Sequence, residues 1–307
     1  MARILFVKTS SLGDVVHNCP AVSDAARSTG GAQIDWVVEE AFADVARMHR
    51  CVRRVIPVAL RRWRAALWSA GVWREIAAFK RELAAERYDA VIDTQGLLKS
   101  ALVARFAFGR KHGMDGASAR EPMAARFYDV AHAVPRPLHA VERNRRLTAA
   151  ALGYALEGAC DYGLQGKAAG SSGAYALLLT MTSRADKLWP ESRWIELGRA
   201  LALPVVLPWG SEEERSRAER VAQGLGQAVV PNRKPIKELA EVLLNAKRVV
   251  GLDSGLTHLA AALGVPTVGI YCGSDPALTG LYGAANARNV GARGKPPEVV
   301  DVLKSFA

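Results

Sequence analysis

The residues best suited to chemistry follow a short apolar segment near residue 250. Residues 249–252 predict a buried strand, and the polar run Asp253-Ser254-Gly255-Leu256-Thr257-His258 comes directly after it. Gly264 and Pro266 predict the end of a helix that begins at Ser254. Such a helix presents backbone N–H groups, two hydroxyls and an uncrowded glycine at its positive end, which suits a phosphate group. An ordinary capped turn that binds nothing is the alternative.

A second candidate lies near the start of the chain, in Thr9-Ser10-Ser11-Leu12-Gly13-Asp14. This polar turn follows the apolar residues 3–8 and precedes a helix that we expect over residues 15–27. A carboxylate at the end of a glycine turn could accept a proton from an alcohol. The alternative is that Asp14 only caps the helix, because aspartate is a favoured N-cap residue.

Two loops of the second half also carry polar residues after a predicted strand. Thr182, Ser183 and Lys187 follow the strand expected at 175–179, and Lys187 is a natural partner for a phosphate at the Ser254 helix. Glu212 follows the strand expected at 204–207 and could bind a ribose hydroxyl. A hydrated surface lysine and carboxylates that merely favour a helix N-terminus are the alternatives.

Arginine and tryptophan alternate in the first half, in Arg61-Arg62-Trp63-Arg64 and again through Trp68 to Trp73-Arg74. Guanidinium groups bind carboxylates and phosphates through paired hydrogen bonds, and tryptophan favours the membrane interface. The segment therefore suits acidic glycans at a membrane surface. The same composition could bind nucleic acid or form a solvated basic helix.

The net charge of +11 is concentrated in the same half of the chain. Residues 1–150 hold 24 Lys and Arg against 15 Asp and Glu, a balance of +9, whereas residues 151–307 hold 17 against 15, a balance of +2. We therefore expect the first half to face a large anionic partner and the second half a small ligand.

Several classes of protein are disfavoured by what the sequence lacks. No Gly-x-Gly-x-x-Gly follows the first predicted strand, and Gly-Lys-Ser/Thr, Asp-x-Asp and His-Glu-x-x-His do not occur, so we expect no cofactor and no metal. The four cysteines are far apart and are expected to be reduced core thiols. No apolar run is long enough for a signal peptide or a membrane span, which predicts a soluble cytoplasmic protein.

Strands and helices are expected to alternate through both halves. Strands are expected at 3–8, 34–38, 52–56, 90–93, 175–179, 204–207, 248–251 and 267–271, and helices at 15–27, 40–48, 72–87, 97–107, 139–152, 191–202, 211–224, 236–246 and 255–263. This alternation predicts the α/β class, with parallel sheets covered on both faces. The Gly, Ala and Ser residues of 156–174 place a domain boundary there. We therefore expect two Rossmann-like domains, 1–165 and 166–307, that face each other across a cleft.

Six motifs, in this order, resemble the bacterial lipopolysaccharide heptosyltransferases over nearly the whole chain. They are Lys8-Thr-Ser-Ser-Leu-Gly-Asp14, Trp36-Val-Val-Glu-Glu40, Arg61-Arg-Trp-Arg64, Asp93-Thr-Gln-Gly96, Asp186-Lys-Leu-Trp-Pro190 and Asp253-Ser-Gly-Leu-Thr-His258. The second and third motifs are similar to those of the members that add the first heptose to the Kdo of the inner core. The resemblance implies the GT-B fold, ADP-L-glycero-β-D-manno-heptose as donor, Kdo₂-lipid A as acceptor and inversion at the anomeric carbon.

The resemblance also implies a role for each matching residue. Asp14 would be the general base for the Kdo hydroxyl, and Lys187 would assist the departure of ADP. The implied donor contacts are Thr182, Ser183 and Lys187 for the diphosphate, Glu212 or Glu213 for the ribose, Lys234 for the adenine, and Asp253, Ser254, Gly255, Leu256, Thr257 and His258 for the phosphate and heptose. The implied acceptor contacts are Ser10, Ser11, Gly13, Arg61, Arg62, Arg64, Gln95 and Arg120. A diphosphate would repel Asp253, so we expect that carboxylate to contact sugar hydroxyls or the backbone of its turn.

Two alternatives differ from this interpretation in class or in substrate. One is a related transferase that uses another nucleotide sugar or that adds the second heptose. The other is a nucleic-acid-binding protein, which the basic first half would suit but which no nucleic-acid motif supports. The resemblance instead implies a protein without a nucleic-acid partner that makes transient contact with the anionic cytoplasmic face of the inner membrane.

Overall fold

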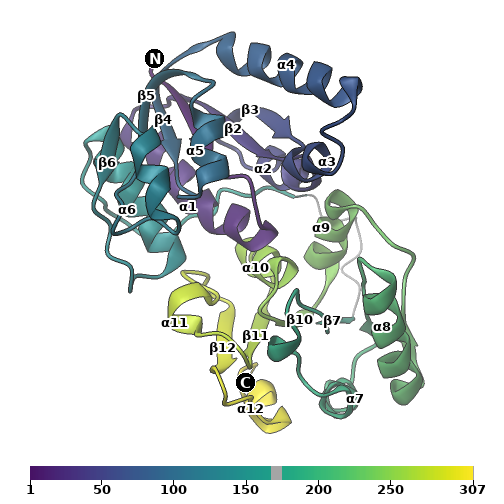
Figure 1. Cartoon of the computed structure of the whole chain (residues 1–307). Helices are drawn as coiled ribbons and strands as arrows, with labels where there is room; N and C mark the ends of the chain where they lie inside the picture. Colours follow the sequence, from purple (N-terminus) through teal and green to yellow (C-terminus); the bar gives the residue numbers. More distant parts are fainter. Residues whose placement is uncertain (167–174, 307) are drawn as a thin grey trace. The chain divides into compact units, whose positions relative to one another are not determined.

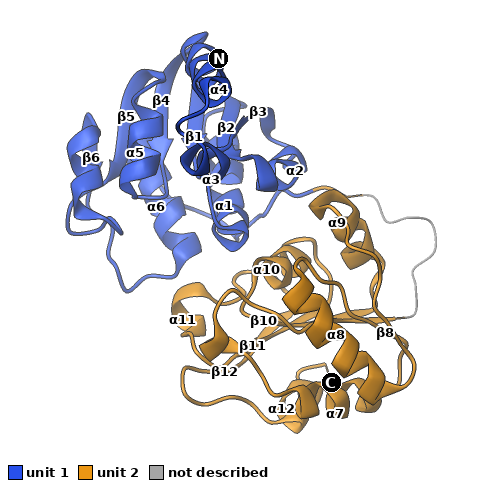
Figure 2. Ribbon diagram, turned by 45° about the vertical axis from the view of Figure 1, so that its right-hand side comes forward, with its two compact units in different colours: residues 1–164 blue, residues 165–307 orange. Residues whose placement is uncertain are grey.

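The computed structural model describes residues 1–166 and 175–306, and it divides into two compact units. The first unit is Met1–Leu164 and the second is Gln165–Ala307 (Figure 2). The boundary expected from the sequence, between residues 165 and 166, lies one residue further along the chain. Part of the Gly-rich segment that predicted it, 167–174, lies outside the described residues.

The first unit is a six-stranded parallel sheet with the order β3-β2-β1-β4-β5-β6. Its strands are β1 (Arg3–Val7), β2 (Gln33–Glu39), β3 (Val52–Val58), β4 (Arg87–Asp93), β5 (Phe108–Met114) and β6 (Val130–His132). Its helices are α1 (Leu12–Ser28), η1 (Glu40–Phe42), α2 (Ala43–Arg47), α3 (Leu60–Ala65), α4 (Ala70–Ala84), α5 (Leu98–Ala104), η2 (Pro122–Phe127) and α6 (Ala140–Leu152) (Figure 1).

Helices cover both faces of this sheet because the strand order reverses direction at β1. Leu5 and Val7 of β1 pack in one core with Phe79 of α4 and Val103 of α5. Strand β1 is followed by α1 and lies next to both β2 and β4, so right-handed crossovers in the two directions put α1 and α5 on opposite faces. Helices α1 and α6 pack against each other.

The second unit repeats this architecture with the strand order β12-β11-β10-β7-β8-β9, again all parallel. Its strands are β7 (Ala176–Leu179), β8 (Val205–Val206), β9 (Ala228–Val229), β10 (Arg248–Leu252), β11 (Thr267–Tyr271) and β12 (Ala287–Gly291). Its helices are η3 (Ala185–Lys187), α7 (Glu191–Ala200), α8 (Glu212–Leu225), α9 (Ile236–Asn245), α10 (Gly255–Ala262), α11 (Pro276–Thr279) and α12 (Val299–Lys304). The predicted α/β class with two Rossmann-like sheets is confirmed.

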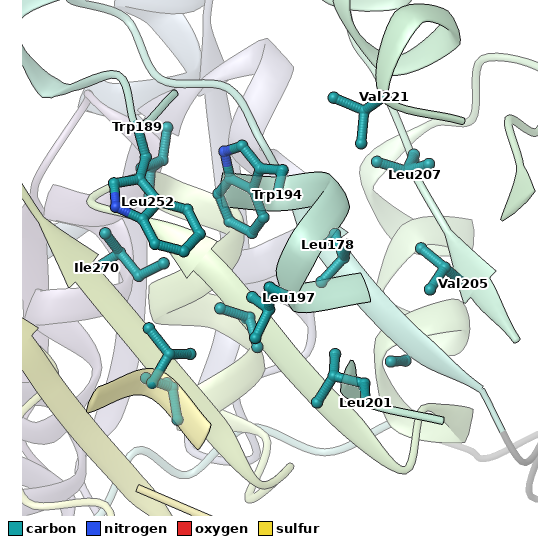
Figure 3. Packing of buried hydrophobic residues seen from close by; sticks show 14 of the residues in the cluster. Leu178, Trp189, Trp194, Leu197, Leu201, Val205, Leu207, Val221, Leu252 and Ile270 are labelled. Atoms are coloured by element: carbon teal, nitrogen blue, oxygen red, sulfur yellow. The ribbon is translucent and has the colours of Figure 1, made fainter. Parts of the chain in front are cut away.

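Two buried tryptophans anchor the core on one face of this sheet (Figure 3). Trp189 and Trp194 meet edge to face, with ring centroids 5.1 Å apart, and both pack among the aliphatic side chains of β7, β10 and α7. The indole N–H of Trp189 donates to the Pro297 carbonyl at 3.0 Å. The loop before α12 is thereby tied to the loop that carries Lys187.

The structure contains several elements that the sequence patterns did not predict: β5, β6, β9, β12, α3, α11 and α12. The missed strands lie at or near sheet edges; β6 and β9 are only three and two residues long, whereas β5 and β12 contain charged and glycine residues. Alternation is weak in such segments because solvent replaces one packing partner. No helix of residues 1–166 and 175–306 is long and apolar enough to cross a membrane.

Candidate active site

The candidate residues of the second unit gather at one edge of its sheet. Thr182, Ser183 and Lys187 follow β7, Glu212 follows β8, Lys234 follows β9, and residues 253–258 follow β10. All six strands are parallel, so their carboxyl ends form the same edge. Ligands of open α/β sheets bind at this edge, where the loops leave the strands.

Asp253 is the centre of a hydrogen-bonded cluster at the end of β10. Its Oδ2 accepts hydrogen bonds from Lys187 Nζ at 2.7 Å and from Ser274 Oγ at 2.6 Å, and its Oδ1 lies 3.2 Å from His258 Nε2. The Thr182 hydroxyl donates to the backbone carbonyl of Asp253 at 2.9 Å. Loops after three neighbouring strands, β7, β10 and β11, are therefore joined through this one residue.

The Asp253 carboxylate stays ionised in this cluster. Burial by itself would raise the pKa of Asp253, but His258, Lys187 and Ser274 stabilise the charged form and hold the pKa well below its usual range. Lys187 is mostly buried beside it. The carboxylate thus fixes the ammonium group of Lys187 at the edge of the sheet.

Helix α10 begins directly after this carboxylate, and its first turn is shaped by small residues. The Thr257 hydroxyl donates to the Leu252 carbonyl at 2.6 Å and lies 3.0 Å from Ser254 Oγ. A Cβ on Gly251 would lie 2.2 Å from Thr257 Oγ1, so only glycine fits there. Ser254 occupies the N-cap position, but its side chain does not bond to the first backbone N–H groups.

Two of the residues expected near the phosphate, Thr257 and Ser254, form hydrogen bonds within this turn. Thr257 is fully buried, and its hydroxyl donates a hydrogen bond to the Leu252 carbonyl. This bond stabilises the start of the helix from the buried side. Ser254 is the N-cap residue of α10, and its hydroxyl pairs with Thr257 Oγ1 rather than with a backbone N–H group. Gly255 and Leu256 are partly exposed and lie at the positive end of the helix, where their N–H groups suit an anion.

Ser274 belongs to the site but was not predicted from the sequence. It follows β11 in the run Cys272-Gly273-Ser274, at the same edge as Asp253. A Cβ on Gly273 would lie 2.5 Å from the Asp186 carbonyl, so this glycine lets the β11 loop pack against η3. A small polar run after the strand neighbouring β10 was the signal that could have identified it.

The loops after β8 and β9 are joined by a tryptophan. Trp209 Nε1 donates to the Pro231 carbonyl at 2.7 Å. Glu214 Oε2 accepts from the Gly210 backbone at 2.6 Å and is used within the loop, whereas the side chain of Glu212 is 77% exposed. Glu213 is exposed as well, so either carboxylate is accessible to a ligand. Lys234 pairs with Glu238 at 2.9 Å.

In the first unit, the candidate residues again follow the carboxyl ends of strands. Ser10 to Asp14 follow β1, Arg61 to Arg64 follow β3, Gln95 follows β4 and Arg120 follows β5. Helix α1 begins at Leu12, three residues earlier than expected. Ser11 is its N-cap, and the Asp14 carboxylate accepts the Ser11 backbone N–H at 3.0 Å. The predicted capping alternative for Asp14 therefore takes the form of a capping box, with Asp14 in the first turn.

Two cations stabilise the Asp14 carboxylate. Arg120 donates to Oδ1 at 2.5 Å from the loop after β5, and the buried Lys8 lies at the end of β1. Burial by itself would raise the pKa of Asp14, but Lys8 and Arg120 hold it well below its usual range. Burial also lowers the pKa of Lys8 to about 8, while its Nζ donates to the Thr94 carbonyl at 2.9 Å. Lys8 was not assigned a role from the sequence.

Gln95 and Ser10, two of the expected acceptor contacts, are buried and hydrogen-bonded within the protein. Gln95 is 2% exposed, and its Oε1 accepts from the Thr9 backbone at 2.6 Å and the Thr9 hydroxyl at 2.8 Å. Ser10 is buried as well, and its hydroxyl accepts from Lys99 Nζ at 3.1 Å. Both residues therefore hold the loop that carries Asp14. Ser11 is exposed and Gly13 partly exposed.

The three arginines of α3 have different surroundings. Arg62 bridges Glu40 and Glu75, with half of its side chain exposed. The Arg61 guanidinium lies 5.5 Å from the ring centroid of Phe42. Arg64 is exposed and has no ion-pair partner among the described residues. In the part of the chain that the structure describes, no three His, Cys, Asp or Glu side chains come together as a metal site.

Comparison with known proteins gives a consistent result. The family model described as "Glycosyltransferase family 9 (heptosyltransferase)" matches residues 76–304. The curated protein "Lipopolysaccharide heptosyltransferase 1" of Escherichia coli K12 is 48% identical over 290 residues, which cover 92% of this chain and 91% of that relative.

Two solved structures share the fold over nearly the whole chain. The structure described as "E. coli heptosyltransferase WaaC with ADP" has a TM-score of 0.90 at 44% identity and covers 99% of this chain and 98% of its own. The structure described as "E. coli heptosyltransferase WaaC with ADP-2-deoxy-2-fluoro heptose" has a TM-score of 0.87 at 43% identity, with the same coverage.

Proposed function

Because the chain belongs to glycosyltransferase family 9, the heptosyltransferases, we propose that it transfers L-glycero-D-manno-heptose from ADP-heptose to the first Kdo of Kdo₂-lipid A, with inversion at the anomeric carbon. The observation that carries the donor assignment is the cluster of Lys187, Asp253 and the start of α10 at one sheet edge. A relative of 43% identity has been solved with an ADP-heptose analogue, which supports the same donor here.

The second unit would bind the donor along its sheet edge. The diphosphate would lie at the N–H groups of Gly255 and Leu256, where the helix dipole and the Lys187 ammonium both favour negative charge. Thr182 and Ser183 would add hydroxyl contacts, with His258 and Asp253 facing the heptose. Glu212 or Glu213 would bind the ribose, and Lys234 would border the adenine. Lys187, which is held in place by Asp253, would stabilise the charge that develops on the departing ADP, so that no metal is required.

The first unit would bind the acceptor and remove its proton. In one displacement, the Kdo hydroxyl oxygen bonds to the anomeric carbon, the bond from that carbon to the β-phosphate oxygen breaks, and the hydroxyl proton passes to the Asp14 carboxylate. ADP leaves with the bonding electron pair, and attack from the opposite face inverts the anomeric centre. In this proposal the group that accepts the proton belongs to the first unit and the groups that stabilise the leaving ADP belong to the second.

Arg120 would serve both the base and the acceptor. Its guanidinium pairs with Asp14, which keeps the base ionised but lowers its proton affinity. A Kdo carboxylate that takes over one face of Arg120 would weaken this pair and raise the pKa of Asp14 towards its usual range. Arg61 and Arg64 are available to bind further acidic groups of the acceptor. The enzyme would act at the cytoplasmic face of the inner membrane, where the acceptor is anchored.

Release of ADP from ADP-heptose tests the assignment directly. We expect release only when Kdo₂-lipid A is present, with a product that gains one heptose. An already heptosylated core or a UDP-sugar should not substitute for either partner. Equal transfer to the heptosylated core would instead identify a transferase of the second heptose, and ADP release that does not depend on any acceptor would contradict the proposal.

A further inference from the structure

The exposed tryptophans and phenylalanines of the described residues all belong to one sequence stretch of the first unit. Among residues 1–166 and 175–306, the exposed tryptophans and phenylalanines are Trp68, Trp73, Phe106 and Phe108, all within a stretch of residues 68–108. Trp68 is 85% exposed and lies between α3 and α4, next to Leu67, which is 47% exposed. Side chains of this size are costly to expose to water, so their concentration indicates a surface that is covered in function.

The α3–α4 corner, defined here as Arg64, Leu67, Trp68, Trp73 and Arg74, is built on a well-packed base. Trp73 Nε1 donates to the Leu67 carbonyl at 2.8 Å, which fixes the turn that presents Trp68. The buried Trp63 beneath it packs edge to face on Phe79, with ring centroids 5.6 Å apart, and donates to Glu75 at 2.8 Å. The indole of Trp68 is therefore presented to solvent by an ordered support.

The surroundings of the α3–α4 corner are positively charged. Helices α3 and α4 contain six Lys and Arg and two Glu, a balance of +4. One of those glutamates, Glu75, is already paired with Arg62. Lys80 Nζ lies 4.3 Å from the ring centroid of Phe106, which extends the basic and aromatic surface from α4 to the end of α5.

We propose that the α3–α4 corner is the docking surface of this enzyme on an anionic phospholipid bilayer. Tryptophan prefers the boundary between headgroups and acyl chains, and adjacent basic residues are attracted to anionic headgroups. Helix α3 leads directly into the corner and also carries Arg61 and Arg64, the proposed acceptor contacts. The inference therefore rests on the proposed function, in which the acceptor is anchored in a membrane by its lipid A.

Vesicle binding by the full-length protein tests the docking surface without any reaction. Vesicles of phosphatidylethanolamine with phosphatidylglycerol should retain the protein in a salt-sensitive manner, and vesicles of phosphatidylcholine alone should not. The double change Leu67→Ser with Trp68→Ser, and separately Arg74→Glu with Arg81→Glu, should each weaken binding about tenfold or more. The matched control is Val229→Ser with Val300→Ser, two exposed apolar residues of the second unit, which should bind like the parent protein.

Transfer rates then separate failure of this inference from failure of the proposed function. The Leu67→Ser, Trp68→Ser variant should retain parental turnover on a deacylated, soluble Kdo₂ acceptor and lose about tenfold on Kdo₂-lipid A in vesicles. Equal rates of variant and parent on vesicles, or unchanged vesicle binding, would overturn the docking surface. A parent protein that transfers heptose to neither acceptor would overturn the proposed function, whereas the binding result would still decide the docking surface.

Discussion

At the scale of single residues, the two aspartates of the proposed sites, Asp14 and Asp253, are both ionised but have different surroundings. Asp14 and Asp253 are each held ionised by nearby donors, which include a lysine in both cases. Both carboxylate oxygens of Asp253 are in contact with Lys187, Ser274 or His258. Arg120, the partner of Asp14, is instead a loop residue whose side chain is exposed. A partner that can be displaced suits a base, and a saturated carboxylate suits a support for Lys187.

Replacing Lys187 by alanine should weaken donor binding and slow transfer, by about tenfold to a thousandfold in kcat/KM, because the leaving diphosphate loses its cation. Steady-state kinetics with ADP-heptose as the varied substrate provides the measurement. Lys237→Ala, an exposed lysine on α9, is the matched control and should behave like the parent. Kinetics for Lys187→Ala that match this control would remove Lys187 from the site.

Replacing Arg120 by methionine should shift the acid limb of the pH–rate profile to higher pH. Arg120 lowers the pKa of Asp14, so its removal raises that pKa, and the carboxylate is then protonated at a higher pH than in the parent. Lys8 remains in place, so the shift should be partial. The profile of kcat/KM on the acceptor gives the result, with Arg126→Met as the control. If the acid limb does not shift, the group whose ionisation it measures is not Asp14.

At the scale of elements, both proposed sites are formed by turns that connect the end of a parallel strand to a helix or a short helical segment. In the second unit, the turn between β10 and α10 depends on Gly251, because Thr257 Oγ1 fills the space where a Cβ would lie. That hydroxyl in turn bonds to the Leu252 carbonyl. Strand, turn and helix start are thus one packed unit, and the position of the α10 N-terminus follows from it.

Changing Gly251 to alanine should therefore disturb the donor site through its support. We expect a loss of about 1 to 3 kcal/mol in the free energy of unfolding, since the added methyl must displace Thr257 or Leu179, together with weaker ADP binding. Urea unfolding and ADP titration measure the two effects. Gly116→Ala, whose Cβ would have 3.7 Å to its nearest neighbour, should change neither. Parental stability and affinity in Gly251→Ala would contradict this account of the turn.

The sequence predicts central strands and amphipathic helices well. Central strands are buried on both faces and are apolar throughout, whereas amphipathic helices are buried on one face and show the helical period. The sequence fails at edge strands such as β9, where two residues carry no periodicity. It also gives no information about the partners of polar side chains, because these partners depend on tertiary contacts. Gln95 and Arg62 have the residue types of ligand-binding groups, yet one holds the Thr9 backbone and the other bridges two glutamates. Ser274 follows β11, the next strand along the chain after β10, and its contact with Asp253 depends on the pairing of these two strands.

At the scale of the whole molecule, the charge asymmetry of the sequence matches the proposed division of labour. The first unit holds 24 Lys and Arg against 17 Asp and Glu, a balance of +7, and carries the proposed sites for an acidic, membrane-anchored acceptor. The second unit holds 17 against 13, a smaller balance of +4, and carries the proposed site for a small nucleotide sugar. Each unit has its own sheet and its own core. Ligands of the two kinds should consequently leave separate footprints on the full-length protein.

Hydrogen exchange in the full-length protein should reveal these footprints. ADP should slow exchange in peptides that contain residues 182–187, 251–258 and 272–274, because binding suppresses local opening of those turns. A deacylated Kdo₂ acceptor should slow exchange around residues 9–14, 60–65 and 118–121. Protection of both sets by ADP alone would contradict the separation of donor and acceptor contacts between units.

The central claim, that the first unit supplies the base and the second unit holds the donor, is tested most directly by Asp14→Asn. Turnover with ADP-heptose and Kdo₂-lipid A and the Kd for ADP should be measured on the same preparation. The control is Asp44→Asn, which changes a partly exposed carboxylate that pairs with Arg47. The account predicts that kcat falls about 10² to 10⁴-fold while the Kd for ADP stays at the parental value. Near-normal turnover in a correctly folded Asp14→Asn protein would contradict it.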